Sequence, residues 1–350
     1  MHVPDGFINA PVSVAAGVVA AGAVAVTLRG ARRELDDRTA PLAGLVAAFI
    51  FAVQMLNFPV AAGTSGHLLG GALAAILVGP YSGVLCVSVV LLMQGILFAD
   101  GGLTALGVNI VIMGVVTVVV SYALFRGLVK VLPGGRRSVT ASAFVAALVS
   151  VPASAAAFTL LYAVGGTADV PIGKVLTAMV GVHVLIGIGE AVITAATVGA
   201  VIAVRPDLVH GARGLAAPLK LRVGGELVDA PAAAPAPVAA RSTRAVWGVG
   251  LAGALVLAGF VSFYASASPD GLEKVAADHG IDRNVEEHDA AGSPLADYGV
   301  NDVDDPRLSG GLAGVIGVGV TVVTGSGVFW AARRRRTEEP AWADRVEETV

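Results

Sequence analysis

Residues 39–99 read TAPLAGLVAAFIFAVQMLNFPVAAGTSGHLLGGALAAILVGPYSGVLCVSVVLLMQGILFA, without a single Asp, Glu, Lys or Arg. A membrane-spanning helix needs about 20 consecutive apolar residues, so this run is too long for two simple crossings. We therefore predict three membrane segments, 41–57, 67–79 and 82–99. The middle segment is short for a full crossing and ends at Gly79-Pro80.

The rest of the chain has the same character. Of its 350 residues, 55% are hydrophobic and 14% charged, whereas soluble chains carry about 25% charge. The 45 glycines suit helices that pack closely in lipid. The sequence therefore predicts an all-α, polytopic membrane protein. Charge-free or nearly charge-free runs add segments at 11–28, 101–125, 138–168, 175–204, 245–266 and 309–332.

The nine predicted segments divide into two groups. Seven lie in a domain of residues 1–225, and two lie in a module of residues 245–332 with an acidic loop at 268–308. Residues 226–244 connect the two parts and include the Ala/Pro-rich run 230–240, which has the composition of a semi-rigid linker. Residues 333–350 form a charged tail.

The distribution of charge predicts the orientation. If residue 1 lies outside, alternation of the segments places 19 of the 23 Lys and Arg residues in cytoplasmic loops, as the positive-inside rule requires. Loop 268–308 then lies outside, with eleven acidic and three basic residues. We expect a multi-pass plasma-membrane protein with an extracytoplasmic N-terminus and a cytoplasmic C-terminus. Because the basic cluster follows the first apolar run, we do not expect a cleaved signal peptide.

Composition also narrows the functional class. A formal net charge of −3 with so few charged residues argues against nucleic-acid binding. A single cysteine, Cys86, excludes a disulfide framework and a cysteine-cluster metal site. Any metal would have to bind nitrogen or oxygen donors.

The first residues, Met1-His2-Val3-Pro4-Asp5-Gly6, offer such donors. The Met1 amine, the His2 amide nitrogen and the His2 imidazole can close fused chelate rings on one metal, a donor set that suits Ni(II), Cu(II) or Co(II). An arbitrary residue after a start codon is the alternative reading of His2. A fourth donor could be His67 in the loop 57–67, on the same outer side. His67 could instead cap a helix start, with Thr64 and Ser65 serving the backbone.

Other polar residues lie in or beside the predicted segments. Ionisable groups in a membrane are costly and commonly functional, and His183 and Glu190 share a helix face, compatible with a polar network or an ion pathway. Interhelical hydrogen bonding is the alternative for Gln94 and Asn109. We take these four residues, with Asn57 and Ser65 in the His67 loop, as candidates for groups around the metal or along its path.

The start MH-x-PDG and the loop GTSGHLLG at residues 63–70 resemble the CbiM/NikM family, the substrate-binding membrane subunits of energy-coupling-factor (ECF) transporters for cobalt and nickel. The resemblance covers about residues 1–225. It implies a seven-helix bundle and a near-planar site of four nitrogens from Met1, His2 and His67. It also implies a coupling transmembrane subunit and ABC ATPase subunits as partners, in a lipid bilayer.

The second module resembles the PDGLE module of NikN-type accessory subunits. The residues that carry this resemblance are Pro269, Asp270, Gly271, Leu272 and Glu273. A fusion of two membrane proteins through a cytoplasmic linker follows from it. His279 and His288 in the acidic loop could gather metal together with its acids, but we expect the loop to be solvated. The PDGLE resemblance leans toward nickel, but such modules also accompany cobalt systems, so both metals stay open.

No G-x-x-x-x-G-K-[ST] phosphate loop occurs in the sequence, so we expect a transporter subunit that is not an enzyme, with no cofactor beyond the transported Ni²⁺ or Co²⁺. One alternative is a stand-alone ion-coupled permease that uses Glu190 and His183 as a proton relay. A membrane scaffold or sensor, which would bind no metal tightly, is another.

Overall fold

The computed structural model describes residues 1–35, 39–61, 63–213, 220–223, 226–229 and 244–333. Within these residues, seven helices are long and apolar enough to cross a membrane. They are α1 (Ala10–Glu34), α4 (Pro80–Leu97), the continuous run Leu106–Val131, α7 (Arg136–Gly165), α8 (Ile172–Val204), the run Arg244–Tyr264 that begins with α9 (Arg244–Gly259), and α11 (Pro306–Ala332). The all-α membrane fold is confirmed.

Shorter elements complete the chain. The run 106–131 consists of α5 (Leu106–Asn109), a π-helical stretch (Ile110–Val116) and α6 (Thr117–Val131). The other helices are α2 (Thr39–Gln54), α3 (Gly71–Val78) and α10 (Gly271–His279), and two hairpins pair β1 (Phe58–Ala61) with β2 (Thr64–Gly66) and β3 (Lys220–Val223) with β4 (Glu226–Asp229). The 3-10 turns are Pro206–Leu208, His210–Ala212, Val261–Tyr264, Ile281–Asn284 and Ala296–Tyr298.

The predicted membrane segment 67–79 is wrong as a spanning helix. The helix there, α3, begins only at Gly71 and has 8 residues, about 12 Å at 1.5 Å per residue. The hairpin β1–β2 directly precedes this segment, and residues 67–70, between β2 and α3, form neither helix nor strand. Non-helical backbone at membrane depth is tolerated only where protein covers it, and residues 64–77 are buried throughout.

The predicted segment 101–125 also differs at its start, because its helix begins at Leu106 and the residues before it form a loop. Of the predicted linker, residues 226–229 form strand β4, and residues 230–243 lie outside the described residues. The tail beyond Arg333 does so too.

Two buried acids stabilise helix starts. The Glu34 carboxylate accepts hydrogen bonds from the backbone N–H groups of Tyr81 (3.2 Å) and Ser82 (2.7 Å) at the start of α4. Glu190, on α8, does the same just before α3, as described below. These are the N–H groups that a helix cannot pair internally.

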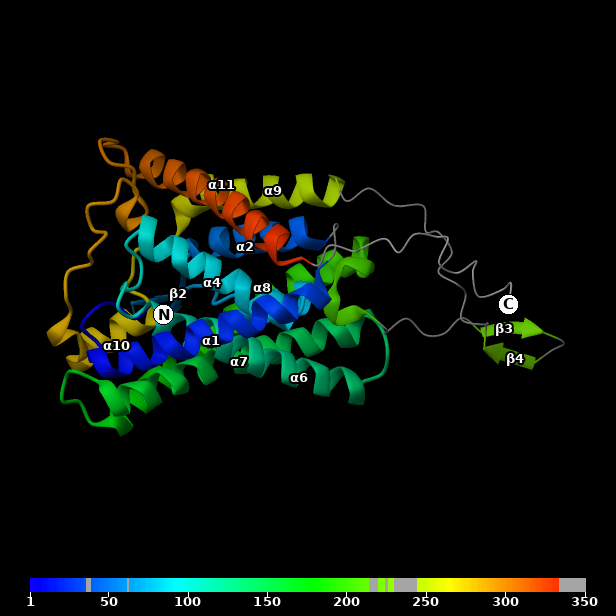
Figure 1. Cartoon of the computed structure of the whole chain (residues 1–350), viewed down its shortest axis with the longest axis horizontal. Helices are drawn as coiled ribbons and strands as arrows, with labels where there is room; N and C mark the ends of the chain where they lie inside the picture. The colour runs from blue at the N-terminus through cyan, green and yellow to red at the C-terminus, as the bar shows by residue number, and fades with distance from the viewer. Residues whose placement is uncertain (36–38, 62, 214–219, 224–225, 230–243, 334–350) are drawn as a thin grey trace, which may run out of the picture.

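The C-terminal helices α9 and α11 lie along α2 (Figure 1). The contact is close because small residues meet there: a Cβ on Gly44 would lie 2.7 Å from the Ser326 nitrogen, and one on Gly317 would clash with Phe51. Gly314 approaches the Ala258 carbonyl of α9 in the same way. Close approach through small residues is typical of helix packing in membranes.

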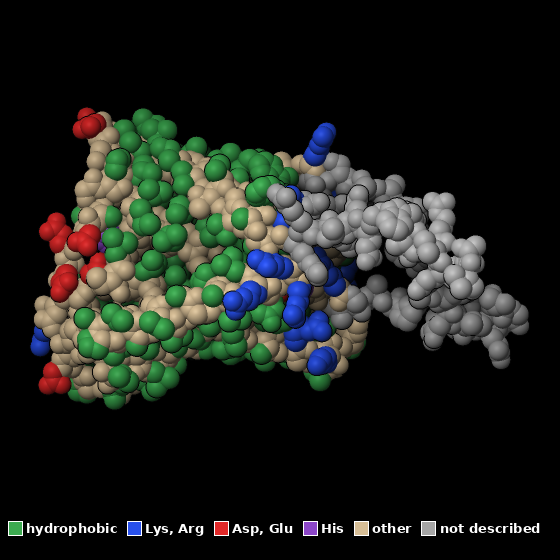
Figure 2. Space-filling view, viewed as in Figure 1, with side chains coloured by type: hydrophobic (Ala, Val, Ile, Leu, Met, Phe, Trp, Pro, Cys, Tyr) green, Lys and Arg blue, Asp and Glu red, His purple; other side chains and the backbone are tan. Residues whose placement is uncertain are grey.

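The two ends of the bundle carry opposite charge. Figure 2 shows Asp and Glu side chains gathered at one end and Lys and Arg side chains at the other. The N-terminus and α10 lie toward the acidic end in Figure 1. The predicted solvated acidic loop is wrong in part, because α10 packs on the bundle: Leu272 and Ala276 are 1% exposed.

Candidate metal site

The first five residues are pinned inside the acidic end of the bundle. Met1 is 2% exposed and Val3 is fully buried. Asn109 accepts a hydrogen bond from the Val3 nitrogen (2.8 Å) and donates to the Val3 carbonyl (3.1 Å). The Asp5 carboxylate accepts the backbone N–H groups of Leu103 (3.1 Å) and Thr104 (2.8 Å). The start of the chain is therefore held at a fixed depth and direction.

This arrangement brings the Met1 amine against His67. The amine nitrogen is 2.5 Å from His67 Nε2 and 2.6 Å from Asp270 Oδ2. His67 Nδ1 is 3.0 Å from the Leu68 carbonyl, to which only a protonated nitrogen can donate. In the neutral imidazole this contact leaves the lone pair on Nε2, which faces the amine, an orientation that metal-binding histidines commonly owe to such a second contact.

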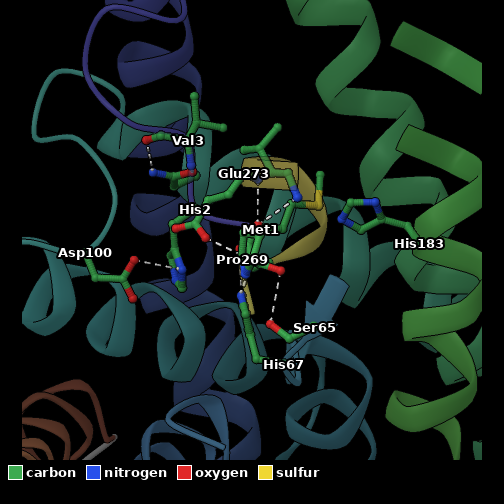
Figure 3. A network of polar contacts seen from close by, with 12 residues as sticks. Met1, His2, Val3, Ser65, His67, Asp100, His183, Pro269 and Glu273 are labelled. Carbon is green, nitrogen blue, oxygen red and sulfur yellow. Dashed lines mark hydrogen bonds and ion pairs between the residues drawn. The ribbon is translucent and has the colours of Figure 1, made fainter. Parts of the chain in front are cut away.

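His2 completes the group, as Figure 3 shows. Its ring stacks on that of His67 with centroids 5.0 Å apart and planes 12° from parallel. His2 Nδ1 is 3.1 Å from Asp100 Oδ1, and Nε2 is buried without a hydrogen-bond partner. Burial lowers the pKa of His2 to about 4, an effect that Asp100 opposes only in part, so the imidazole is neutral at pH 7.

Glu190 positions the His67 loop. Its carboxylate accepts the backbone N–H groups of Leu69 (2.6 Å) and Gly70 (3.0 Å). The alternative that His67, Thr64 and Ser65 cap a helix start is wrong: Thr64 and Ser65 lie in β2, and the cap residue of α3 is Gly70. The N–H groups just before α3 are paired instead by the Glu190 carboxylate of α8. No local sequence pattern could have indicated a partner so far along the chain.

His183 lies behind the amine, on α8, and extends toward Met1 in Figure 3. Its Nδ1 is 2.7 Å from the Met179 carbonyl of the preceding turn, and its Nε2 is buried without a hydrogen-bond partner. Within the described part of the chain, no hydrogen bond joins His183 to Glu190. The two residues share a helix face but have separate partners.

The PDGLE motif closes the site from the second module. Asp270 is the N-cap of α10, and its Oδ1 accepts the N–H groups of Leu272 (2.7 Å) and Glu273 (2.9 Å). Glu273 in turn accepts the Asp270 N–H at 2.9 Å, which completes a capping box. Burial raises the pKa of Asp270, but the Met1 ammonium and His67 outweigh burial and hold that pKa well below its usual range.

Ser65 and Asn57, two candidate residues from the sequence, form hydrogen bonds with backbone groups of the second module. The Ser65 nitrogen donates to the Pro269 carbonyl (2.9 Å) and its hydroxyl to the Ser268 carbonyl (2.7 Å). The Asn57 carbonyl accepts the Ser266 N–H at 2.7 Å. Both residues thereby hold the accessory loop, and Asn57 also lines the cavity next to His67.

Gln94 belongs to a chain of hydrogen bonds that leads to His2. Gln94 Nε2 donates to the Tyr298 hydroxyl (2.9 Å), which donates to Asp100 Oδ2 (2.6 Å). Sequence reasoning missed Asp100 and Tyr298 as site residues. The sequence could have indicated Asp100, because it is the acidic residue that ends the charge-free run 39–99. Tyr298 had no sequence signal that could tie it to a residue 198 positions away.

A cavity of about 600 Å³ adjoins these groups and is lined by His2, His67, Asp100, Asp270 and Tyr298, among others. Among the described residues, no group of three or more His, Cys, Asp or Glu side chains is arranged to hold a metal ion. A metal bound here would therefore have to use backbone nitrogen, and the Met1 amine offers it beside His67 Nε2.

A family model described as "Cobalt uptake substrate-specific transmembrane region", CbiM, matches residues 2–208. The chain belongs to the CbiM family. A PDGLE domain matches residues 244–334, so the CbiM region and the PDGLE domain are fused in one chain. The structure places the PDGLE motif in direct contact with Met1, immediately before the residues that match the CbiM family.

Relatives of the CbiM region bear transport names. A putative metal transport protein of Haloquadratum walsbyi is 41% identical over 60% of this chain and 93% of that protein. A putative fused nickel transport protein NikMN of Archaeoglobus fulgidus is 38% identical over 60% of this chain and 68% of its own. A cobalt transport protein CbiM of Geobacter sulfurreducens is 33% identical over 60% of this chain and 61% of its own.

A solved structure shares the bundle. The crystal structure of a truncated transition metal transporter is similar over 58% of this chain and 99% of that chain, with a TM-score of 0.51 and 26% identity. Family, relatives and this structure together identify a membrane protein of metal transport.

Proposed function

We propose that this chain is the substrate-binding membrane subunit of an ECF-type transporter that takes up Ni²⁺ or Co²⁺ from the extracytoplasmic side. The observation that carries the proposal is the buried Met1 amine, 2.5 Å from His67 Nε2. A free amine is buried only at a cost, and chain ends are ordinarily poorly ordered unless they are tied down. Here the buried amine lies beside an imidazole nitrogen and the Asp270 carboxylate, an arrangement that supports a binding role.

The proposed donors are the Met1 amine, the His2 amide nitrogen, the His2 imidazole and His67 Nε2. For His2 to bind one metal through both its amide nitrogen and its imidazole, the ring must use Nδ1, because Nε2 lies on the far side of the ring. His2 Nδ1 must then leave Asp100, and the Met1 ammonium and the His2 amide must each release a proton to solvent. The neutral imidazole, the oriented Nε2 and the anchored chain start lower the reorganisation that binding requires.

Metal retention by the purified full-length protein tests the proposal. Two residues added before Met1, or His67→Ala, should abolish binding of Ni²⁺ and Co²⁺ as measured by elemental analysis, because each removes a donor or its access. His279→Ala is the matched control, since His279 is exposed on α10. Metal retained by the extended protein at the wild-type level would refute the proposed site.

We propose that the acidic end faces outward and that coupling and ATPase subunits bind the basic end. The positive-inside rule and the separation of charge support this orientation. The alternative of a stand-alone permease has less support, because both Glu190 oxygens hold the His67 loop instead of facing His183. Uptake by vesicles that contain this chain alone, driven by a pH gradient, would favour the permease.

A further inference from the structure

We infer that Asp270, in the PDGLE domain, is a further ligand of the transported metal, so that both domains of the chain hold one ion. This inference deepens the proposed function and rests on it, because it takes the Met1 amine and His67 as donors. The Asp270 carboxylate would add one oxygen to a nitrogen donor set.

The distances at the amine fit a single ion. First-row divalent metals lie about 2 Å from nitrogen and oxygen ligands, so two ligands of one ion are at most about 4 Å apart. Asp270 Oδ2 is 2.6 Å from the Met1 nitrogen and 3.6 Å from His67 Nε2, and those two nitrogens are 2.5 Å apart. All three atoms therefore lie within reach of one metal.

The Asp270 carboxylate is also held in place for this role. Oδ1 is occupied by two backbone N–H groups at the start of α10, which leaves Oδ2 to face the amine. The helix itself is fixed, because a Cβ on Gly271 would lie 2.7 Å from Ile186 and 3.2 Å from His183 of α8. A ligand on a rigid element needs little reorganisation to bind.

Charge favours the same assignment. Asp270 is 8% exposed, and its Oδ2 is paired with the Met1 ammonium. When the amine nitrogen binds a metal, the amine loses its proton to solvent, and the ion takes the place of the ammonium. Oδ2 can then bind the ion or accept a hydrogen bond from the metal-bound amine, and binding the ion keeps a positive charge directly beside the buried carboxylate. Mixed nitrogen and oxygen donors are acceptable to both nickel and cobalt.

Asp270→Asn separates the proposed role from the structural one. Asparagine is an N-cap as good as aspartate, so α10 keeps its start while the metal-facing oxygen is replaced by an amide. Asp278→Asn is the matched control, because it removes one negative charge from the exposed side of the same helix. Each full-length variant is titrated with NiCl₂ or CoCl₂, and X-ray absorption is recorded on the nickel-loaded protein.

We expect Asp270→Asn to weaken metal binding by about 10–100-fold, the range seen when groups that support metal ligands are lost, and Asp278→Asn to change it by less than about threefold. The X-ray absorption spectrum of the nickel-loaded wild type should indicate five ligands. The absorption-edge feature that is typical of planar four-coordinate nickel should be weak in this spectrum. That feature should become strong in Asp270→Asn.

A planar four-nitrogen spectrum of the wild type would overturn the inference even if Asp270→Asn failed to fold. So would binding by Asp270→Asn within about twofold of wild type. In either of these cases, loss of binding by His67→Ala in the same assay would leave the proposed function standing, and only the inference would fall. If His67→Ala binds as well as wild type, the proposed function itself fails.

Discussion

At the scale of single residues, the described site depends on groups that are far apart in sequence and unusual in their chemistry. Met1 contributes a backbone amine, and His67 reaches it only because Glu190 holds the two N–H groups that follow in the chain. Buried donors without an acceptor cost about 1–3 kcal/mol each, so Glu190 matters for both stability and binding.

Glu190→Ala should destabilise the protein by about 2–6 kcal/mol, because it leaves the Leu69 and Gly70 N–H groups buried and unpaired, and it should weaken metal binding by displacing His67. Thermal unfolding in detergent and metal titration measure the two effects. Thr194→Val, one turn further along α8, is the control, since the Thr194 hydroxyl is buried with no partner. Equal stability of the two variants would contradict the anchoring role.

Acidification should destabilise the metal-free protein through His2. Burial lowers the pKa of His2 from about 6.5 to about 4. Between these values the unfolded chain binds a proton at His2 that the folded chain does not, so stability falls as the pH drops from about 6.5 toward 4, by up to about 3 kcal/mol. When unfolding is measured at several pH values, the free energy of unfolding should fall less with acidification in His2→Phe than in wild type or in His279→Phe.

At the scale of elements, α2 and α11 join the two domains. A Cβ on Gly44 would lie 2.7 Å from the Ser326 nitrogen, whereas one on Gly22 of α1 would meet nothing within 4 Å. The PDGLE domain therefore depends on small residues of the CbiM region for its place, and α10 depends on that placement to reach Met1.

Gly44→Leu should separate the domains, because its side chain occupies the volume of α11. A protease site inserted after residue 235 allows the chain to be cut after purification. The two pieces should remain together in the wild-type background and in Gly22→Leu, and should part in Gly44→Leu. Co-purification of the Gly44→Leu pieces would show that the α2–α11 contact is dispensable.

At the scale of the whole molecule, opposite charges mark the two ends of the bundle (Figure 2). In the described residues, Asp289 lies in the acidic loop and Arg137 at the start of α7, and both are exposed. Their positions make the proposed orientation measurable.

A membrane-impermeant maleimide should label Asp289→Cys in intact cells and Arg137→Cys only after the cells are opened. The native Cys86 is buried and serves as the internal control, because it should stay unlabelled in the parent protein. The reverse pattern would place the acidic end and Met1 on the cytoplasmic side and contradict uptake from outside.

Hydropathy and motifs predicted the all-α membrane class, most segment positions and the residues Met1, His2 and His67 that the structure brings together. These features are local: a span is a run of apolar residues, and a motif is a short string. The failure at residues 67–79 is also instructive. An apolar run buried among other helices does not need to be helical, since neighbours such as Glu190 can pair its backbone.

The contacts of Asp270, Asp100, Tyr298 and Glu190 were decided by tertiary structure. Each acts on a residue between 98 and 269 positions away, and hydrophobic patterning carries no information about which loops meet at the end of a bundle. Met1 carries the amine in any conformation of this chain. Only the folded bundle buries that amine beside an imidazole and a carboxylate, because only folding can meet the cost of removing a charge from water.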